Sequence, residues 1–177
     1  LMLDKGIESV TVDEIARSAD MAKGSFYRYF VDKAELVEAV VEPMTHAIRR
    51  SLAAAENSIG GATSEPALLA AYAALGLELQ RVLVTFPKVV QLYLQENRAP
   101  RTEARAPISD LADEISEGAV ALTQLAQEGG LLRTVAPRIS ALAVVGAVER
   151  LLFESLSEGE LGVSQAEAAR TLITLVM

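Results

Sequence analysis

Helix start and stop signals divide this sequence into helices, and they are most closely spaced near its beginning. Thr11-Val12-Asp13-Glu14 has the form of a capping box, in which the threonine and glutamate side chains each accept from the other residue's backbone N–H. The box predicts a short helix to about residue 19, which Asp20-Met21 ends. A second short helix is expected over about 22–29, and Asp32-Lys33-Ala34-Glu35 forms a box for a long helix to about 56. This arrangement is typical of a helix-turn-helix.

The remaining sequence also divides into helices and shows no alternating strand pattern. The expected helices cover about 65–85, 87–97, 108–128, 137–157 and 164–177. The helix over 65–85 is apolar on most faces, which predicts burial inside a bundle. Pro43 inside the long helix predicts a kink, because proline removes one backbone hydrogen bond. The 29 alanines and 24 leucines among 177 residues favour helix over strand. We therefore predict an all-α fold, with a helix-turn-helix domain over residues 1–42 and a larger helical domain over residues 43–177.

Composition excludes several kinds of site. Without cysteine the chain has no disulfide, thiol nucleophile or zinc finger, and one histidine cannot form a histidine cluster. Only a metal site made of carboxylates stays open, and the acidic run of Asp110, Asp113 and Glu114 is most simply a solvated helix face. His46 is expected to be structural or exposed, and no glycine-rich phosphate loop is present. We predict no enzyme, no cofactor and no metal.

The spacing of charged residues argues against a membrane-spanning segment. The longest stretch without one, residues 66–77, has 12 residues, against the roughly 18 to 20 that cross a bilayer. The first residues do not have the basic and apolar regions of a secretory signal. We therefore expect a cytoplasmic protein with no membrane segment.

The two short helices share an expected core and leave a polar face. Expected core residues are Val10, Ile15, Ala16, Ala19, Met21, Phe26 and Phe30. Residues left outward on the second helix are Lys23, Gly24, Ser25, Tyr27, Arg28 and Tyr29. Four basic and two acidic residues between Arg17 and Lys33 give this region a charge of +2 in a chain of −8. Cations, hydroxyls and a small glycine suit a phosphate backbone and base edges. The pattern alone fits DNA binding and a surface corner of a helical bundle equally well.

Three stretches carry a resemblance to a known family. Gly6 to Ala16, Lys23 to Phe30 and Lys33 to Leu36 resemble the DNA-binding domain of the tetracycline-repressor (TetR) family. The resemblance implies a homodimeric, ligand-controlled regulator, usually a repressor, that binds a palindromic operator in double-stranded DNA. It places Lys23 and Gly24 at bases and Arg28 at bases or phosphates. The residues that it places at phosphates are Thr11, Ser25, Tyr27, Tyr29 and Lys33.

The sequence departs from the family pattern at three points. Asp20 stands where the family usually has glycine, in a turn expected to be left-handed. Ala22 stands where serine or threonine often caps the second short helix, so that cap is missing. Only five residues precede Gly6, which leaves the family's first helix nearly absent and indicates a truncated or missing N-terminus.

The larger domain is expected to hold a ligand and a partner subunit. A cavity for a small, mostly apolar effector would be lined by Tyr72, Leu75, Leu79, Phe86, Tyr93, Glu96, Ile115, Glu149 and Phe153. The expected dimer interface consists of Leu142, Gly146, Arg150, Phe153, Ala169 and Ile173. Taken singly, each cavity residue is more simply explained by ordinary core packing. For the interface residues, the alternative to a dimer is that they complete the core of one subunit. The competing function is a helical small-molecule sensor or interaction module without DNA binding.

Overall fold

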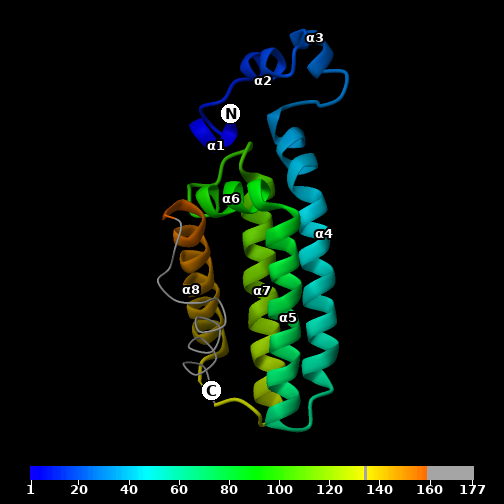
Figure 1. Ribbon diagram of the computed structural model, residues 1–177, viewed down its shortest axis with the longest axis vertical. Coiled ribbons are helices and arrows are strands. Elements are labelled where there is room, and N and C mark those ends of the chain that lie inside the picture. The colour runs from blue at the N-terminus through cyan, green and yellow to red at the C-terminus, as the bar shows by residue number, and fades with distance from the viewer. Residues whose placement is uncertain (134, 159–177) are drawn as a thin grey trace. The chain divides into compact units, whose positions relative to one another are not determined.

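The computed structural model describes residues 1–133 and 135–158, and this part of the chain folds as helices without strands (Figure 1). The helices are α1 (Met2–Lys5), α2 (Val12–Ser18), α3 (Lys23–Phe26), α4 (Lys33–Gly60), α5 (Glu65–Thr85), α6 (Pro87–Glu96), α7 (Ala106–Glu128) and α8 (Pro137–Glu158). The predicted all-α class is confirmed for these residues. The helix expected over 164–177 lies outside the described residues.

Most helix boundaries agree with the sequence signals, with two differences. α3 is shorter than predicted, because its last expected residues form turns after Phe26. α4 continues through Asn57, where a loop was expected, and ends at Gly60. The Asn57 and Ser58 side chains donate to the carbonyls of Ala53 and Ala54, at 3.0 and 2.9 Å. These bonds satisfy the polar side chains within the helix, so they do not end it.

The chain forms two compact units, which we describe separately. Unit 1 consists of residues 1–46 and 86–113, and unit 2 of residues 47–85 and 114–177. Unit 1 therefore contains α6 and the start of α7 besides the helix-turn-helix, and α1 lies against α6 within it (Figure 1). The predicted division after residue 42 did not anticipate that α6 belongs with the N-terminal helices, and as a division into domains it stays a prediction.

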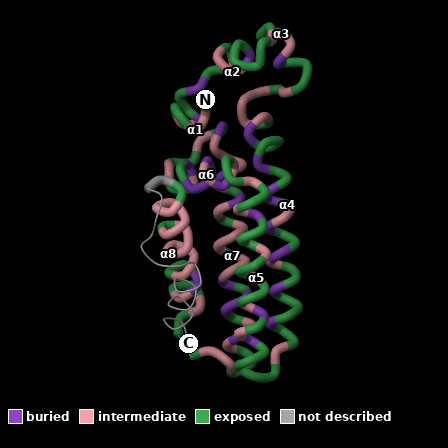
Figure 2. The backbone as a smooth tube through the Cα atoms, in the orientation of Figure 1, coloured by how far each residue is buried: buried purple, intermediate pink, exposed green. Residues whose placement is uncertain are grey.

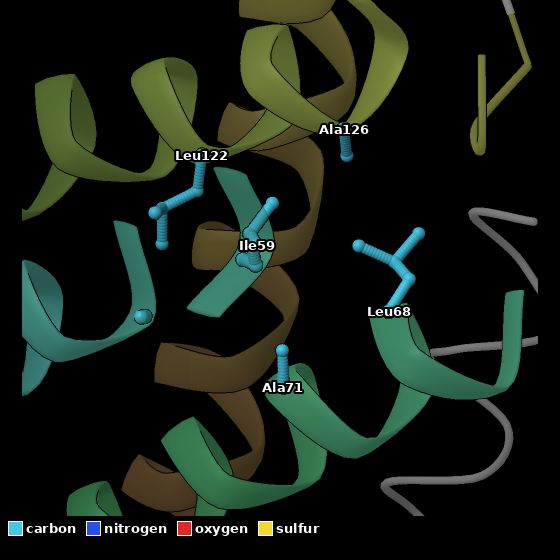
Figure 3. Packing of buried hydrophobic residues seen from close by; sticks show 6 residues of the cluster. Ile59, Leu68, Ala71, Leu122 and Ala126 are labelled. Atoms are coloured by element: carbon cyan, nitrogen blue, oxygen red, sulfur yellow. The ribbon is translucent and has the colours of Figure 1, made fainter. Parts of the chain in front are cut away.

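Unit 2 has a core between three helices. α4 contributes Ala55 and Ile59, α5 contributes Leu68 and Ala71, and α7 contributes Leu122 and Ala126 (Figure 3). Alternating large and small side chains let the helices approach closely, and close packing of this kind supplies most of the stability of a helix in a protein.

The end of α7 is fixed by its backbone. Gly130 has a φ of 69°, in the left-handed region. The N–H of Leu131 donates to Ala126 O at 3.1 Å, and the N–H of Gly130 donates to Gln127 O at 2.9 Å. This pair of bonds is a Schellman motif, which favours glycine at the left-handed position.

The expectation that α5 is buried on most faces is wrong. Leu77 is 58% exposed and Val84 is 74% exposed, and much of the helix is exposed in Figure 2. With 21 residues and a mean hydropathy of 1.5, α5 is long and apolar enough to span a membrane by length and composition. The charge-free run missed this property, because Glu78 and Arg81 interrupt an otherwise apolar helix. Core helices of soluble proteins pass the same test, so one such helix is weak support for a membrane span.

Candidate nucleic-acid interface

The first helix of the helix-turn-helix, α2, is held by the predicted capping box. The N–H of Glu14 donates to Thr11 Oγ1 at 3.2 Å, and the N–H of Thr11 donates to Glu14 Oε2 at 2.9 Å. Lys5 Nζ donates to Glu14 Oε1 at 2.7 Å. The hydrogen bonds from Lys5 and from the Thr11 backbone lower the pKa of the Glu14 carboxyl from its ordinary 4.5 to about 2. The start of α2 is therefore satisfied by its own side chains.

The turn between the short helices uses the residue that departs from the family pattern. Asp20 has a φ of 54°, so the predicted left-handed conformation is confirmed. The N–H of Met21 donates to Ala16 O at 2.9 Å, and the N–H of Asp20 donates to Arg17 O at 3.2 Å. These two bonds are again a Schellman motif, and aspartate tolerates the left-handed position better than most side chains do.

The second helix, α3, has no such local support. Its N-cap residue, Ala22, makes no side-chain cap bond, as predicted. Phe26 is only 2% exposed and lies 5.4 Å from the rings of both Tyr27 and Phe30. α3 packs against α2 (Figure 1). Burial of Phe26, rather than capping, therefore holds this helix in place.

The expected small core is confirmed in part. Val10, Ala16 and Phe26 are buried, while Ile15, Met21 and Phe30 are half-buried. Ala19 is exposed, so its assignment to the core is wrong, because it ends α2 at the edge of the turn. Ile7 is fully buried and was missed. Its position just after Gly6, outside any predicted helix, gave no periodic signal.

The predicted outward face of α3 and the turn after it is exposed. Lys23, Gly24, Tyr27, Arg28 and Tyr29 are exposed, and Ser25 is half-buried. A methyl group added at Gly24 would meet nothing within 4 Å, so the helix surface is open there. Lys23 Nζ lies 3.0 Å from Asp13 Oδ1, and this hydrogen-bonded partner raises the pKa of the Lys23 ammonium. The face therefore presents cations and phenols to the outside.

Two residues expected at phosphates have partners inside the protein. The Thr11 hydroxyl serves the cap of α2, although the residue is exposed. Lys33 Nζ donates to the carbonyls of Ile7, Glu8 and Val10, at 2.7, 3.1 and 3.0 Å.

Glu96, which was expected to orient a ligand, also makes hydrogen bonds inside unit 1. It is 4% exposed. Its Oε1 accepts from the N–H of Ile7 at 3.0 Å, and its Oε2 accepts from Arg105 Nε at 2.6 Å. No local sequence pattern indicates this contact, since residues 7 and 96 lie far apart along the chain.

The other residues expected to line a ligand cavity fall in both units. In unit 1, Tyr93 is buried and Phe86 is half-buried. In unit 2, Leu79 is exposed, and the half-buried residues are Tyr72, Leu75, Ile115, Glu149 and Phe153. Burial raises the pKa of the Tyr72 hydroxyl. A shallow depression of about 450 Å³ lies instead at the helix-turn-helix, where Asp13, Ala16, Arg17, Asp20, Met21, Ala22 and Lys23 line it. The effector cavity stays a prediction.

The residues expected at a dimer interface are partly described. Leu142 is 39% exposed, and Gly146 and Phe153 are half-buried. The Arg150 guanidinium lies 6.0 Å from the Phe153 ring centroid and pairs with Glu154 at 2.6 Å. Ala169 and Ile173 lie outside the described residues. Ile139, 73% exposed one turn before Leu142, extends the apolar surface of α8 and was missed.

In the described residues, an N-terminal helix-turn-helix precedes a set of longer helices, an arrangement that helix-turn-helix transcriptional regulators have. Residues 1–40 match the family described as bacterial regulatory proteins, tetR family. The resemblance found in the sequence is thus confirmed for residues 1–40, the part of the chain that matches this family. This is a family of regulators and not of enzymes, as predicted.

Curated relatives align with a limited part of the chain. It is 37% identical over 67 residues to the HTH-type transcriptional regulator BetI of Cronobacter sakazakii, covering 38% of this chain and 33% of BetI. It is 49% identical over 41 residues to the transcriptional regulator AcuR of Cereibacter sphaeroides, covering 23% and 19%. It is 36% identical over 52 residues to the HTH-type transcriptional regulator YxbF of Bacillus subtilis, covering 29% and 14%. The chain thus spans about a third or less of each relative's length.

A solved structure resembles the whole chain. The TetR-family transcriptional regulator from Rhodococcus sp. aligns with a TM-score of 0.62 over 99% of this chain and 92% of its own. The sequences are 21% identical, so the likeness shows the shared fold.

Proposed function

We propose that this chain binds a palindromic operator in double-stranded DNA as a homodimer and represses transcription until a small, mostly apolar effector releases it. The observation that carries the proposal is the exposed face of α3 and its following turn, with Lys23, Tyr27, Arg28 and Tyr29. A recognition helix enters the major groove with a face of this kind.

The contacts divide by chemistry. Lys23 can donate to guanine acceptors in the major groove, and Gly24 lets the backbone approach the bases closely. Hydroxyls on Ser25, Tyr27 and Tyr29 suit phosphates, which fix the register without reading sequence. Arg28 can serve either purpose. The acidic chain, at −8, argues against nonspecific coating of DNA and favours a small local site.

Dimerisation would give the protein its palindromic target. Two recognition helices related by a two-fold axis read two half-sites, provided that their separation matches the DNA helical repeat. The exposed apolar side chains of α8, Ile139 and Leu142, support a role for this helix in the interface. An effector would release the operator only if it binds the state that does not match DNA more tightly.

Selection from a pool of random duplexes tests the proposal. The protein is incubated at low salt with the pool, and bound duplexes are recovered and sequenced. An enriched palindrome is expected, and the molar mass in solution should be that of two chains. Absence of enrichment at low salt would contradict DNA binding and favour the reading as a helical ligand sensor. Enrichment of a single, non-repeated site would contradict the dimer.

A further inference from the structure

Two side chains, Lys33 and Glu96, make hydrogen bonds to the backbone of the segment that leads into α2. This lead-in segment comprises residues 6–10, and its Ile7 and Val10 side chains are fully buried. Its carbonyl groups face Lys33, at the start of α4, and one of its N–H groups faces Glu96, at the end of α6. The residue after it, Thr11, is the N-cap of α2. The position of the segment therefore sets where the helix-turn-helix begins.

Lys33 uses its whole donor capacity on this segment. An ammonium group has three N–H donors and no acceptor. Its three partners are the carbonyls of Ile7, Glu8 and Val10, all within 3.1 Å. No donor is left for a phosphate in this conformation. The tetrahedral shape of an ammonium also suits three converging carbonyls better than the planar guanidinium of arginine does.

Glu96 uses both carboxylate oxygens in the same way. One accepts from the N–H of Ile7 at 3.0 Å and the other from Arg105 Nε at 2.6 Å. Arg105 in turn lies 3.8 Å from the Glu8 carboxylate, which also accepts from the Thr102 hydroxyl. A buried carboxylate is tolerated only when it is paired and hydrogen-bonded, so this group is committed to its site.

Gly6 makes room for the carboxylate. Its φ of 80° lies in the region that favours glycine, and a Cβ there would lie 3.1 Å from Glu96 Oε1. The backbone turn and the close approach of Glu96 thus require the same residue.

We propose that Lys33 and Glu96 are positioning residues that clamp the lead-in segment and so hold α2 and α3 in the geometry that binds DNA. Lys33 acts through the protein backbone rather than through a phosphate, which reverses the role that the family resemblance gives it. This inference rests on the proposed DNA binding, and it adds two residues that act on the recognition helix without touching the operator.

The salt dependence of duplex binding separates the two roles of Lys33. Affinity for the selected duplex is measured over a salt series for the wild type and for Lys33→Met, Lys33→Arg and Lys88→Met. Lys88 is an exposed lysine of α6 and serves as the matched control. A phosphate contact contributes about 0.9 to the slope of log affinity against log salt. We expect Lys33→Met and Lys33→Arg both to lower affinity about 10-fold or more at an unchanged slope, with Lys88→Met near wild type.

Three results would overturn the phosphate-independent role. The first is a slope reduced by about one in Lys33→Met, which marks a phosphate contact. The second is full affinity in Lys33→Arg together with a loss in Lys33→Met, which shows that any cation suffices. The third is wild-type affinity in Lys33→Met, which shows that Lys33 does not position the segment.

Amide hydrogen exchange tests the clamp without DNA. We expect exchange in residues 6–10 to become about 10-fold faster or more in Glu96→Ala and in Lys33→Met, while the α4, α5 and α7 core of unit 2 keeps its protection. Glu96→Gln retains an acceptor for the Ile7 N–H and should give a smaller change, which keeps the test valid if the alanine variant does not fold. Unchanged exchange in Lys33→Met and Glu96→Gln would contradict the clamp. If the wild type binds no duplex, the proposed function fails, and exchange still decides whether the clamp exists.

Discussion

The two short helices of the helix-turn-helix are held in opposite ways. α2 has a complete capping box at its start and a Schellman motif at its end, both made by residues within or next to the helix. α3 has four residues, no cap bond and one buried side chain, Phe26. Local hydrogen bonds therefore define α2, whereas tertiary packing defines α3.

This difference determines which of the two helices has polar side chains that are not used in holding the helix. Capping uses polar side chains near the helix start, as Thr11 and Glu14 do in α2. On α3 the Lys23 side chain stays exposed and Ser25 is half-buried, because a single aromatic ring on the opposite side anchors the helix. A helix built in this way depends on its packing against α2, and its outer face is the one that we propose for DNA.

Among the substitutions that test the difference between α2 and α3, removal of the Phe26 ring should lower stability the most. Phe26→Ala should lower the free energy of unfolding by about 3–5 kcal/mol, because it leaves a cavity between α2 and α3. Tyr29→Ala is the control, since that ring is 70% exposed and should cost less than about 0.5 kcal/mol. Chemical denaturation measures both. Equal losses in the two variants would show that Phe26 is not the anchor.

Removal of the cap should have an intermediate effect on α2. Thr11→Ala should cost about 1 kcal/mol, because the N–H of Glu14 loses its acceptor. Ser18→Ala, at the exposed other end of α2, should change stability by less than about 0.5 kcal/mol. The midpoints of urea unfolding compare the two. A loss in Ser18→Ala as large as that in Thr11→Ala would remove the case for the cap.

Addition of an N-cap side chain should give α3 some of the local stabilisation that α2 already has. Ala22 has a φ of −70° and a ψ of 146°, the extended backbone in which N-cap hydroxyls accept. Ala22→Ser should therefore raise stability, by about 0.5 kcal/mol for so short a helix. The same urea titration provides the measurement. A lower midpoint would mean that the start of α3 cannot use a cap.

Substitution of Gly24 should have the smallest effect on stability but should clearly weaken duplex binding. Gly24→Ala fits without a clash and should gain about 0.4 kcal/mol by restricting the unfolded chain. Its methyl group should nevertheless weaken duplex binding, because it stands between the backbone and the bases. Parallel urea and duplex titrations separate the two effects. Unchanged duplex affinity would show that the backbone does not approach DNA at Gly24.

Local signals predicted the helices and the exposed face well. The capping box at Thr11 and the left-handed turn at Asp20 involve neighbours in sequence, so residue identity was enough to predict them. The exposure of Lys23 and Tyr27 followed from the helical spacing of Phe26 and Phe30 on the other side.

Long-range contacts could not be predicted in this way. Glu96 meets Ile7 across 89 positions, and Lys33 meets the same residue across 26. A buried glutamate near the end of an amphipathic helix has the same sequence pattern as a ligand-orienting one. The apolar faces of α5 likewise predicted burial, although the structure leaves Leu77 and Val84 exposed. The spacing of apolar and polar residues therefore shows which face of a helix is apolar, but it does not show which other part of the chain packs against that face.

The central claim is that the exposed face of α3 binds DNA, and one comparison tests it most directly. Affinity for the selected duplex is measured for the wild type, Lys23→Ala and Lys88→Ala by fluorescence anisotropy. Loss of a base contact should cost about 1–3 kcal/mol, so Lys23→Ala should bind about 5- to 150-fold more weakly and discriminate less against random DNA. Lys88→Ala should bind like the wild type. Equal affinities of Lys23→Ala and the wild type, or an equal loss in Lys88→Ala, would contradict the claim.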